Sequence, residues 1–146
     1  MHGVQKRASY ELLRMPALGQ NIAAASAGAD ADLGVIPHAD LLRLLHAREQ
    51  LCLFWTEVAG KAPIGFPCVP VSEDRMHARW AELVHASGMF VKRMIDPLMG
   101  LQDLIEMPWG GEGFCEKCVR VKLNEWAELR RKLWADLDVL LELTAE

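Results

Sequence analysis

Hydrophobic residues recur every three or four positions along most of the chain, the spacing of one face of an α-helix. Helices are predicted over 4–15, 38–59, 73–87, 97–107 and 116–143, with a weaker one over 17–28. No segment alternates convincingly with the period of two that a half-buried strand requires. We therefore expect an all-α fold, a compact bundle of five or six helices forming a single domain over 1–146.

The 38–59 helix shows the pattern most clearly. Arg48 interrupts its predicted apolar face, which comprises Leu41, Leu44, Leu45, Cys52, Trp55 and Val58 or Ala59. Gly60 and Gly88 are predicted to stop helices, and Asp96 to cap the helix that begins at Pro97. Between helices we expect a flexible N-terminus over about 1–5, a loop over 28–37 and a proline-rich loop over 60–71.

Bulk composition narrows the class of protein. The chain has 146 residues, 51% of them hydrophobic, and a net charge of −4. That balance predicts a globular protein and argues against general nucleic-acid binding, which usually needs a basic surface. No signal peptide and no membrane-spanning run is evident. Four cysteines are too few for a disulfide-built scaffold, so we expect an intracellular protein, cytoplasmic or nuclear.

The strongest chemical motif is the pair Cys115 and Cys118 in "GFCEKCVRVKLNEW". A Cys-x-x-Cys step lets two sulfur atoms face one ion, and zinc takes four ligands in structural sites. The helix predicted to begin near Glu116 would favour thiolates at its N-terminus. Since the pair supplies only half of a tetrahedral site, two further ligands must come from elsewhere in the chain.

Cys68 is the best third ligand, because it lies in a stiff loop between Pro67 and Pro70. His77, on the helix that follows, is the best fourth ligand, with His85 or Cys52 as substitutes. Cys52 is otherwise expected to be a small core residue. With four protein ligands the zinc would be structural and would have no open position for catalysis.

Other interpretations of the cysteine pair stay open. The thiols could be free and packed at a helix start, or one could have a lowered pKa and exchange electrons. Thioredoxin-type chemistry would need a preceding strand, which the pattern does not predict. Of the five tryptophans only Trp109, beside glycines, is a candidate surface anchor; the other four have core spacing.

Several phrases together carry a family resemblance. "YELLRMPAL", "LLRLLHAREQLCLFW", "RWAELVHASGMF", "DPLMGLQDLIE", "FCEKC" and "EWAELRRKLWADLDVLLEL" resemble the region after the BTB/POZ domain in a large family from mushroom-type fungi. The resemblance covers the chain from about Tyr10 onward. The BTB fold itself is missing, which implies either an excised fragment or a stand-alone relative.

The resemblance implies specific residues. Cys68, Cys115 and Cys118 match cysteines of that family, and its last helix matches here at Trp126, Arg130 and Trp134. The family often has a further cysteine before its tryptophan-containing helix. Here that stretch reads "RMHARW", which implies that His77 replaces it as a ligand. Family membership implies a role in interaction and no established activity.

The sequence thus predicts a non-catalytic, zinc-stabilised helical module that binds a protein partner or itself. No nucleic-acid, membrane or small-molecule partner is expected. The surface expected to bind is the basic stretch of the last helix, around Arg120, Lys122, Arg130 and Arg131. The alternative is a small enzyme, either a thiol oxidoreductase that uses Cys115 and Cys118 or a zinc hydrolase.

Overall fold

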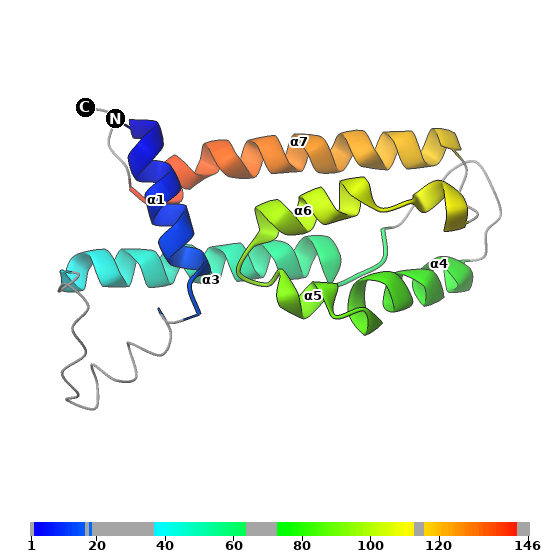
Figure 1. Ribbon diagram of the computed structural model, residues 1–146, viewed down its shortest axis with the longest axis horizontal. Coiled ribbons are helices and arrows are strands. Elements are labelled where there is room, and N and C mark those ends of the chain that lie inside the picture. The colour runs from blue at the N-terminus through cyan, green and yellow to red at the C-terminus, as the bar shows by residue number, and fades with distance from the viewer. Residues whose placement is uncertain (1, 17, 19–36, 64–72, 113–115, 143–146) are drawn as a thin grey trace. The chain divides into compact units, whose positions relative to one another are not determined.

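The computed structural model describes residues 2–16, 18, 37–63, 73–112 and 116–142 (Figure 1). Within these ranges the chain is helical and contains no strand, which confirms the predicted all-α class. The order of elements is α1 (His2–Arg14), α3 (His38–Ala59), α4 (Glu73–Trp80), the π-helix η1 (Ala81–Ala86), α5 (Met89–Lys92), α6 (Pro97–Glu106), the 3₁₀ turn η2 (Trp109–Glu112) and α7 (Glu116–Leu140).

The chain divides into two compact units. Unit 1 comprises Met1–Gln50 and Asp136–Glu146, and unit 2 comprises Leu51–Ala135. The division passes within α3 and within α7, so each of these helices supplies residues to both units. The predicted weak helix over 17–28 and most of the two predicted loops lie outside the described residues.

Unit 1 contains α1, the start of α3 and the end of α7. Its buried side chains include Tyr10, Leu13, Leu44, Ala47, Leu137 and Leu141. Lys6 is also buried and pairs with Asp138 of α7, with 2.8 Å between Nζ and Oδ2. A buried ammonium group is costly unless it is paired, and the Asp138 carboxylate compensates the positive charge of Lys6 here.

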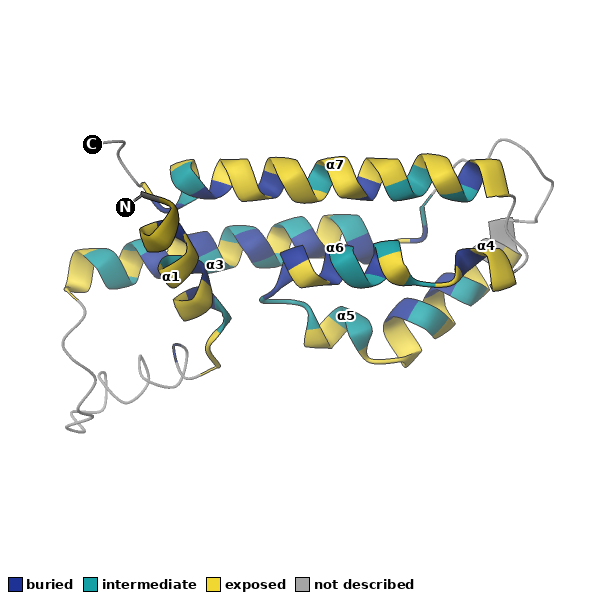
Figure 2. Cartoon of the chain, turned by 45° about the horizontal axis from the view of Figure 1, so that its top comes forward, coloured by how far each residue is buried: buried dark blue, intermediate teal, exposed yellow. Residues whose placement is uncertain are grey.

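The apolar line of α3 differs from the predicted one. The buried residues are Leu44, Ala47, Leu51, Trp55 and Ala59, which follow one another at steps of three and four (Figure 2). Leu41, Leu45 and Cys52 are only half-buried. The prediction favoured large apolar side chains and passed over Ala47, although a small residue is what close packing at a helix contact requires.

In unit 2, Trp55 is completely buried and anchors α3 to α5 and α6. Its indole Nε1 donates to the carbonyl oxygen of Phe90 at 2.8 Å. A Cβ added to Gly100 would lie 2.5 Å from the ring carbon Cη2 of Trp55. Glycine at this position therefore lets α6 approach α3 closely, and any larger side chain would meet the ring.

Helix boundaries in unit 2 follow the predicted signals. Asp96 caps α6, because its Oδ1 accepts a hydrogen bond from the backbone N–H of Met99 at 3.3 Å, and Pro97 occupies the first turn. Gly88 ends the π-helix with φ of 80°. The segment predicted as one helix over 73–87 is instead α4 followed by the wider π-turn η1.

Candidate functional site

The predicted zinc ligands fall partly outside the described residues. Cys68 and Cys115 both lie there. His77 is exposed on α4, and Cys118 is buried in the first turn of α7 with 3% of its surface accessible. Both described ligands belong to unit 2.

No group of three or more His, Cys, Asp or Glu side chains suited to a metal ion occurs among the described residues. Cys68 and Cys115 lie outside those residues, so the four-ligand site stays a prediction. The substitute ligands are both described. His85 is exposed in η1, where its ring centroid lies 4.8 Å from that of Phe90, and Cys52 is half-buried on α3.

Three tryptophan rings form a cluster in unit 2. Trp80 closes α4, Trp109 begins η2 and Trp126 lies on α7. The ring centroids of Trp80 and Trp109 are 5.9 Å apart and nearly parallel, at 14°. Trp126 lies 5.5 Å from Trp109 and 6.3 Å from Trp80. All three are at most 5% exposed.

Two of these indoles also fix backbone positions. The Nε1 of Trp80 donates to the carbonyl oxygen of Ala59 at 3.0 Å, and that of Trp109 donates to Leu104 at 2.7 Å. A buried indole N–H needs an acceptor, and here each acceptor is the end of another helix. The cluster therefore ties α3, α4, α6, η2 and α7 together by ring contacts and hydrogen bonds.

The prediction for the tryptophans was wrong at two positions. Trp109, expected as a surface anchor, is buried in the cluster with 4% exposed, while Trp134, expected in the core, is 38% exposed. The glycines after Trp109 suggested an open turn. The turn η2 instead directs the ring inward, where its N–H donates to the carbonyl oxygen of Leu104, five positions earlier in the chain.

The cluster borders the segments that carry the predicted cysteines. Residues 113–115 join η2 to α7, so Trp109 and Trp126 flank Cys115 along the chain. Residues 64–72 lead into α4, which carries His77 three residues before Trp80. On α7, Cys118 and Trp126 are eight residues apart and share the buried face of the helix with Leu133 and Leu137.

The basic stretch of α7 is largely neutralised within its own helix. Arg120 pairs with Glu116, Lys122 with Glu125 and Arg131 with Glu128. The hydrogen bond and the charge of Arg131 hold the pKa of Glu128 below its ordinary value. The guanidinium Nε of Arg130 donates to the carbonyl oxygen of Leu98 on α6 at 3.2 Å. Because neighbouring charges cancel, the structure does not support a strongly basic docking face here.

Comparison with family models, curated proteins and solved structures found no match to this chain. No helix among the described residues is long and apolar enough to cross a membrane.

Proposed function

We propose that the chain is a non-catalytic helical interaction module whose unit 2 is fastened by one structural zinc ion. The proposed ligands are Cys68, His77, Cys115 and Cys118. The tryptophan cluster is the observation that carries the proposal. It holds α4, which bears His77, against η2 and α7, which border Cys115 on either side.

The chemistry of the α7 start supports the same proposal. A helix N-terminus carries partial positive charge, which stabilises the thiolates that zinc binds. Cys118 lies in that first turn and is shielded from solvent. Four protein ligands would leave no site for a water or a substrate, so the ion would contribute to folding rather than to a reaction.

The proposal assigns a protein as the partner, as the resemblance to the region after the fungal BTB/POZ domain implies. An intracellular compartment belongs to the same proposal. The ion would join the segment before α4 to the segment before α7, and would thereby present a fixed helical surface to a partner.

Metal analysis of protein purified without chelators tests the proposal. We expect one zinc per chain and three thiols that react only after denaturation or chelation. Cys118→Ser should lower the zinc content sharply, and Cys68→Ser and Cys115→Ser should do the same. Cys52→Ser is the matched control, because Cys52 is half-buried on α3 and should leave zinc content unchanged.

Tryptophan fluorescence provides a second readout, since the residues of the cluster lie close along the chain to the segments that carry the proposed ligands. Cobalt in place of zinc should quench the indole emission, and the thiolate-to-cobalt absorption band should be lost in Cys118→Ser. Fully folded protein without metal would overturn the proposal. Metal-free protein with one fast-reacting thiol would favour a thiol oxidoreductase, and a zinc held by only three protein ligands would favour a hydrolase.

A further inference from the structure

Helix α1 in unit 1 has apolar residues on two opposite sides. Its inner side is buried and includes Tyr10 and Leu13. The outer side of α1 is exposed to solvent (Figure 2). It carries a second apolar line, which we call the α1 outer stripe; the line consists of Val4, Ala8 and Leu12 and continues to Met15, directly after the helix end at Arg14. Spacings of four, four and three residues keep these positions on one side of a helix. Val4 is 76% and Met15 51% exposed.

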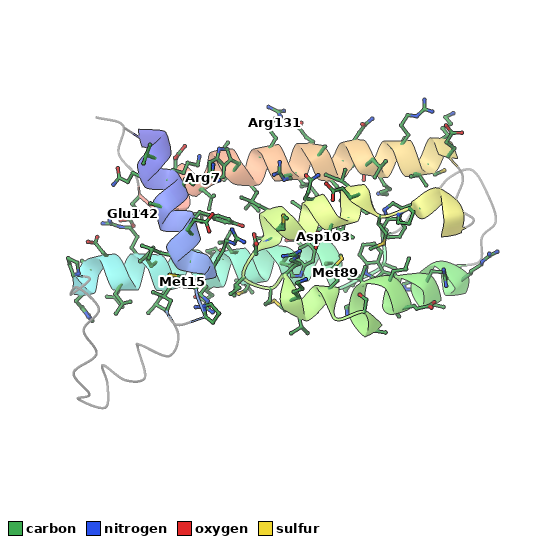
Figure 3. All side chains as sticks on the ribbon, viewed as in Figure 1. Arg7, Met15, Met89, Asp103, Arg131 and Glu142 are labelled. Atoms are coloured by element: carbon green, nitrogen blue, oxygen red, sulfur yellow. The ribbon has the colours of Figure 1, made fainter. Side chains whose placement is uncertain are left out.

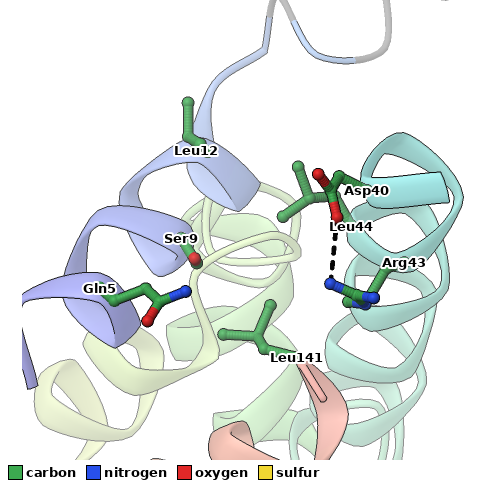
Figure 4. A pocket seen from close by; sticks show the side chains of 7 residues that line it. All are labelled: Gln5, Ser9, Leu12, Asp40, Arg43, Leu44 and Leu141. Carbon is green, nitrogen blue, oxygen red and sulfur yellow. Dashed lines mark hydrogen bonds and ion pairs between the residues drawn. The ribbon is translucent and has the colours of Figure 1, made fainter. Parts of the chain in front are cut away.

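One residue of the outer stripe, Leu12, also borders a hollow of unit 1. The hollow is a cavity of about 250 Å³ between α1 and α3 (Figure 4). The floor of this cavity includes Leu44 and Leu141, which are almost completely buried. The rest of its lining is polar and comes from Gln5, Ser9, Asp40 and Arg43. A side chain that approaches beside Leu12 would therefore meet both leucines and polar groups. Exposed apolar residues scattered singly need no explanation, but a helical line that borders a cavity suggests a contact surface.

The charges beside the stripe indicate what can cover it. Arg7 and Glu11 lie along one edge, and uncharged Gln5 and Ser9 along the other. When two copies of a helix pack antiparallel, like edges meet. Arg7 of each copy would then face Glu11 of the other, giving two symmetric ion pairs. In a parallel pair the charged edge would face the uncharged one, and this complementarity would be lost.

The contacts within α1 leave Glu11 able to exchange its present partner for Arg7 of a second copy. Glu11 pairs with Arg14 of its own helix at 3.0 Å, and both side chains are exposed, so this pair stabilises little. The stripe itself is also self-complementary. In the antiparallel register, Val4 of one copy lies against Met15 of the other, and Leu12 lies against Ala8.

We propose that the α1 outer stripe is a self-association surface, on which a second copy of this chain docks its own α1 antiparallel. This proposal goes beyond the zinc-fastened module and does not depend on the ion. Since α1 has 13 residues and spans about 20 Å, the interface between the two copies is small. A small interface binds weakly, so the fraction of dimer should depend on protein concentration.

Sedimentation equilibrium over a wide concentration range tests the proposal. We expect a monomer–dimer equilibrium whose Kd rises at least tenfold in Leu12→Gln. Leu42→Gln and Val139→Gln are matched controls, because both remove an exposed apolar side chain of unit 1 outside the stripe. Their Kd should stay within about twofold of the parent, and circular dichroism should show equal helix content in all variants.

Charge reversal tests the antiparallel arrangement. Arg7→Glu and Glu11→Arg should each raise the Kd, because each places like charges together across the pair. The double variant should restore the parent Kd, and added salt should weaken the parent dimer. A chain that stays monomeric at high concentration overturns the proposal. A dimer indifferent to Leu12→Gln, or a double variant that fails to restore association, overturns it as well.

Discussion

The two units differ in what lies at their centres: tryptophan rings in unit 2, and leucines with a buried lysine in unit 1. Four tryptophans form the centre of unit 2, each at most 5% exposed, and three of them donate their indole N–H to backbone carbonyls. Unit 1 combines leucines with ion pairs, two of which join segments far apart along the chain. Lys6 pairs with Asp138, and Arg43 pairs with both Asp40 and Glu142. Side chains of both units are drawn in Figure 3.

Because of this difference, the two units should respond differently to changes in salt concentration and pH. Aromatic packing depends on shape and on buried area, which salt and moderate pH change little. Ion pairs at partly exposed sites are screened by salt and depend on the charge of both partners. Unit 1 also combines two separate segments of the chain, whereas unit 2 is one continuous stretch. We therefore expect unit 1 to open first when solution conditions change.

The largest expected effect is in the tryptophan cluster. Trp80→Ala removes a ring that contacts two others and leaves a cavity, so the free energy of unfolding should fall by about 3–5 kcal/mol. Urea denaturation followed by circular dichroism measures this loss. Trp134→Ala is the control, because that ring is 38% exposed and its removal should cost less than about 1 kcal/mol. Equal losses in both variants would contradict the assignment of the core.

Gly100→Ala should come next, with a loss of about 1–3 kcal/mol. Alanine normally stabilises a helix relative to glycine by about 1 kcal/mol, so a loss here reports the clash with Trp55. Gly110→Ala is the matched control, because a Cβ there meets nothing within 4 Å. Thermal or urea unfolding distinguishes the two. A stabilised Gly100→Ala variant would mean that α6 does not approach α3 this closely.

In unit 1, Lys6→Ala should lower the free energy of unfolding by about 1–3 kcal/mol, because it leaves the Asp138 carboxylate without its ammonium partner. The Lys6 side chain is 7% exposed and that of Asp138 35%, so the cost stays below that of a fully buried pair. A double-mutant cycle with Asp138→Asn isolates the coupling. Amide hydrogen exchange should quicken in α1 while α6 stays protected. An equal rise in both helices would show that the units open together.

The smallest effect is expected at the exposed pair of Glu128 and Arg131. Because Arg131 lowers the pKa of Glu128 in the folded state, the contribution of the pair is present above the ordinary pKa of 4.5. It is lost as the pH falls through the lowered value. Glu128→Gln should leave urea unfolding at neutral pH unchanged within error. A loss comparable to that of Lys6→Ala would contradict the distinction between surface and buried pairs.

Much of the fold could be predicted from local patterns. The helix boundaries at Gly60, Gly88 and Asp96 depend on short-range capping interactions, which the residue types themselves indicate. The prediction of the buried face of α3 was only partly correct, because hydrophobicity alone favoured Leu41 and Cys52 over Ala47. Small residues at a helix contact are selected by the neighbour they face, and that neighbour is not visible in a one-dimensional pattern.

The candidate site also has features that the sequence predicts and features that it does not. The Cys-x-x-Cys pair and the proline-bound Cys68 are recognisable because metal ligands have a fixed chemistry and spacing. The contact of Trp109 with Trp80 and Trp126 was not recognisable. It joins three segments far apart along the chain, and nothing local distinguishes a tryptophan that turns inward after a proline from one that stays on the surface.

Sequence alone determined the all-helical class, the capped start of α6 and the residue types that could hold a metal, because each depends on neighbours a few positions away. Only the tertiary structure decided which tryptophans form the core, that Lys6 is buried against Asp138, and that α1 keeps an apolar side in solvent. Those outcomes depend on which helix faces cover one another, a property of the packed chain rather than of any one segment.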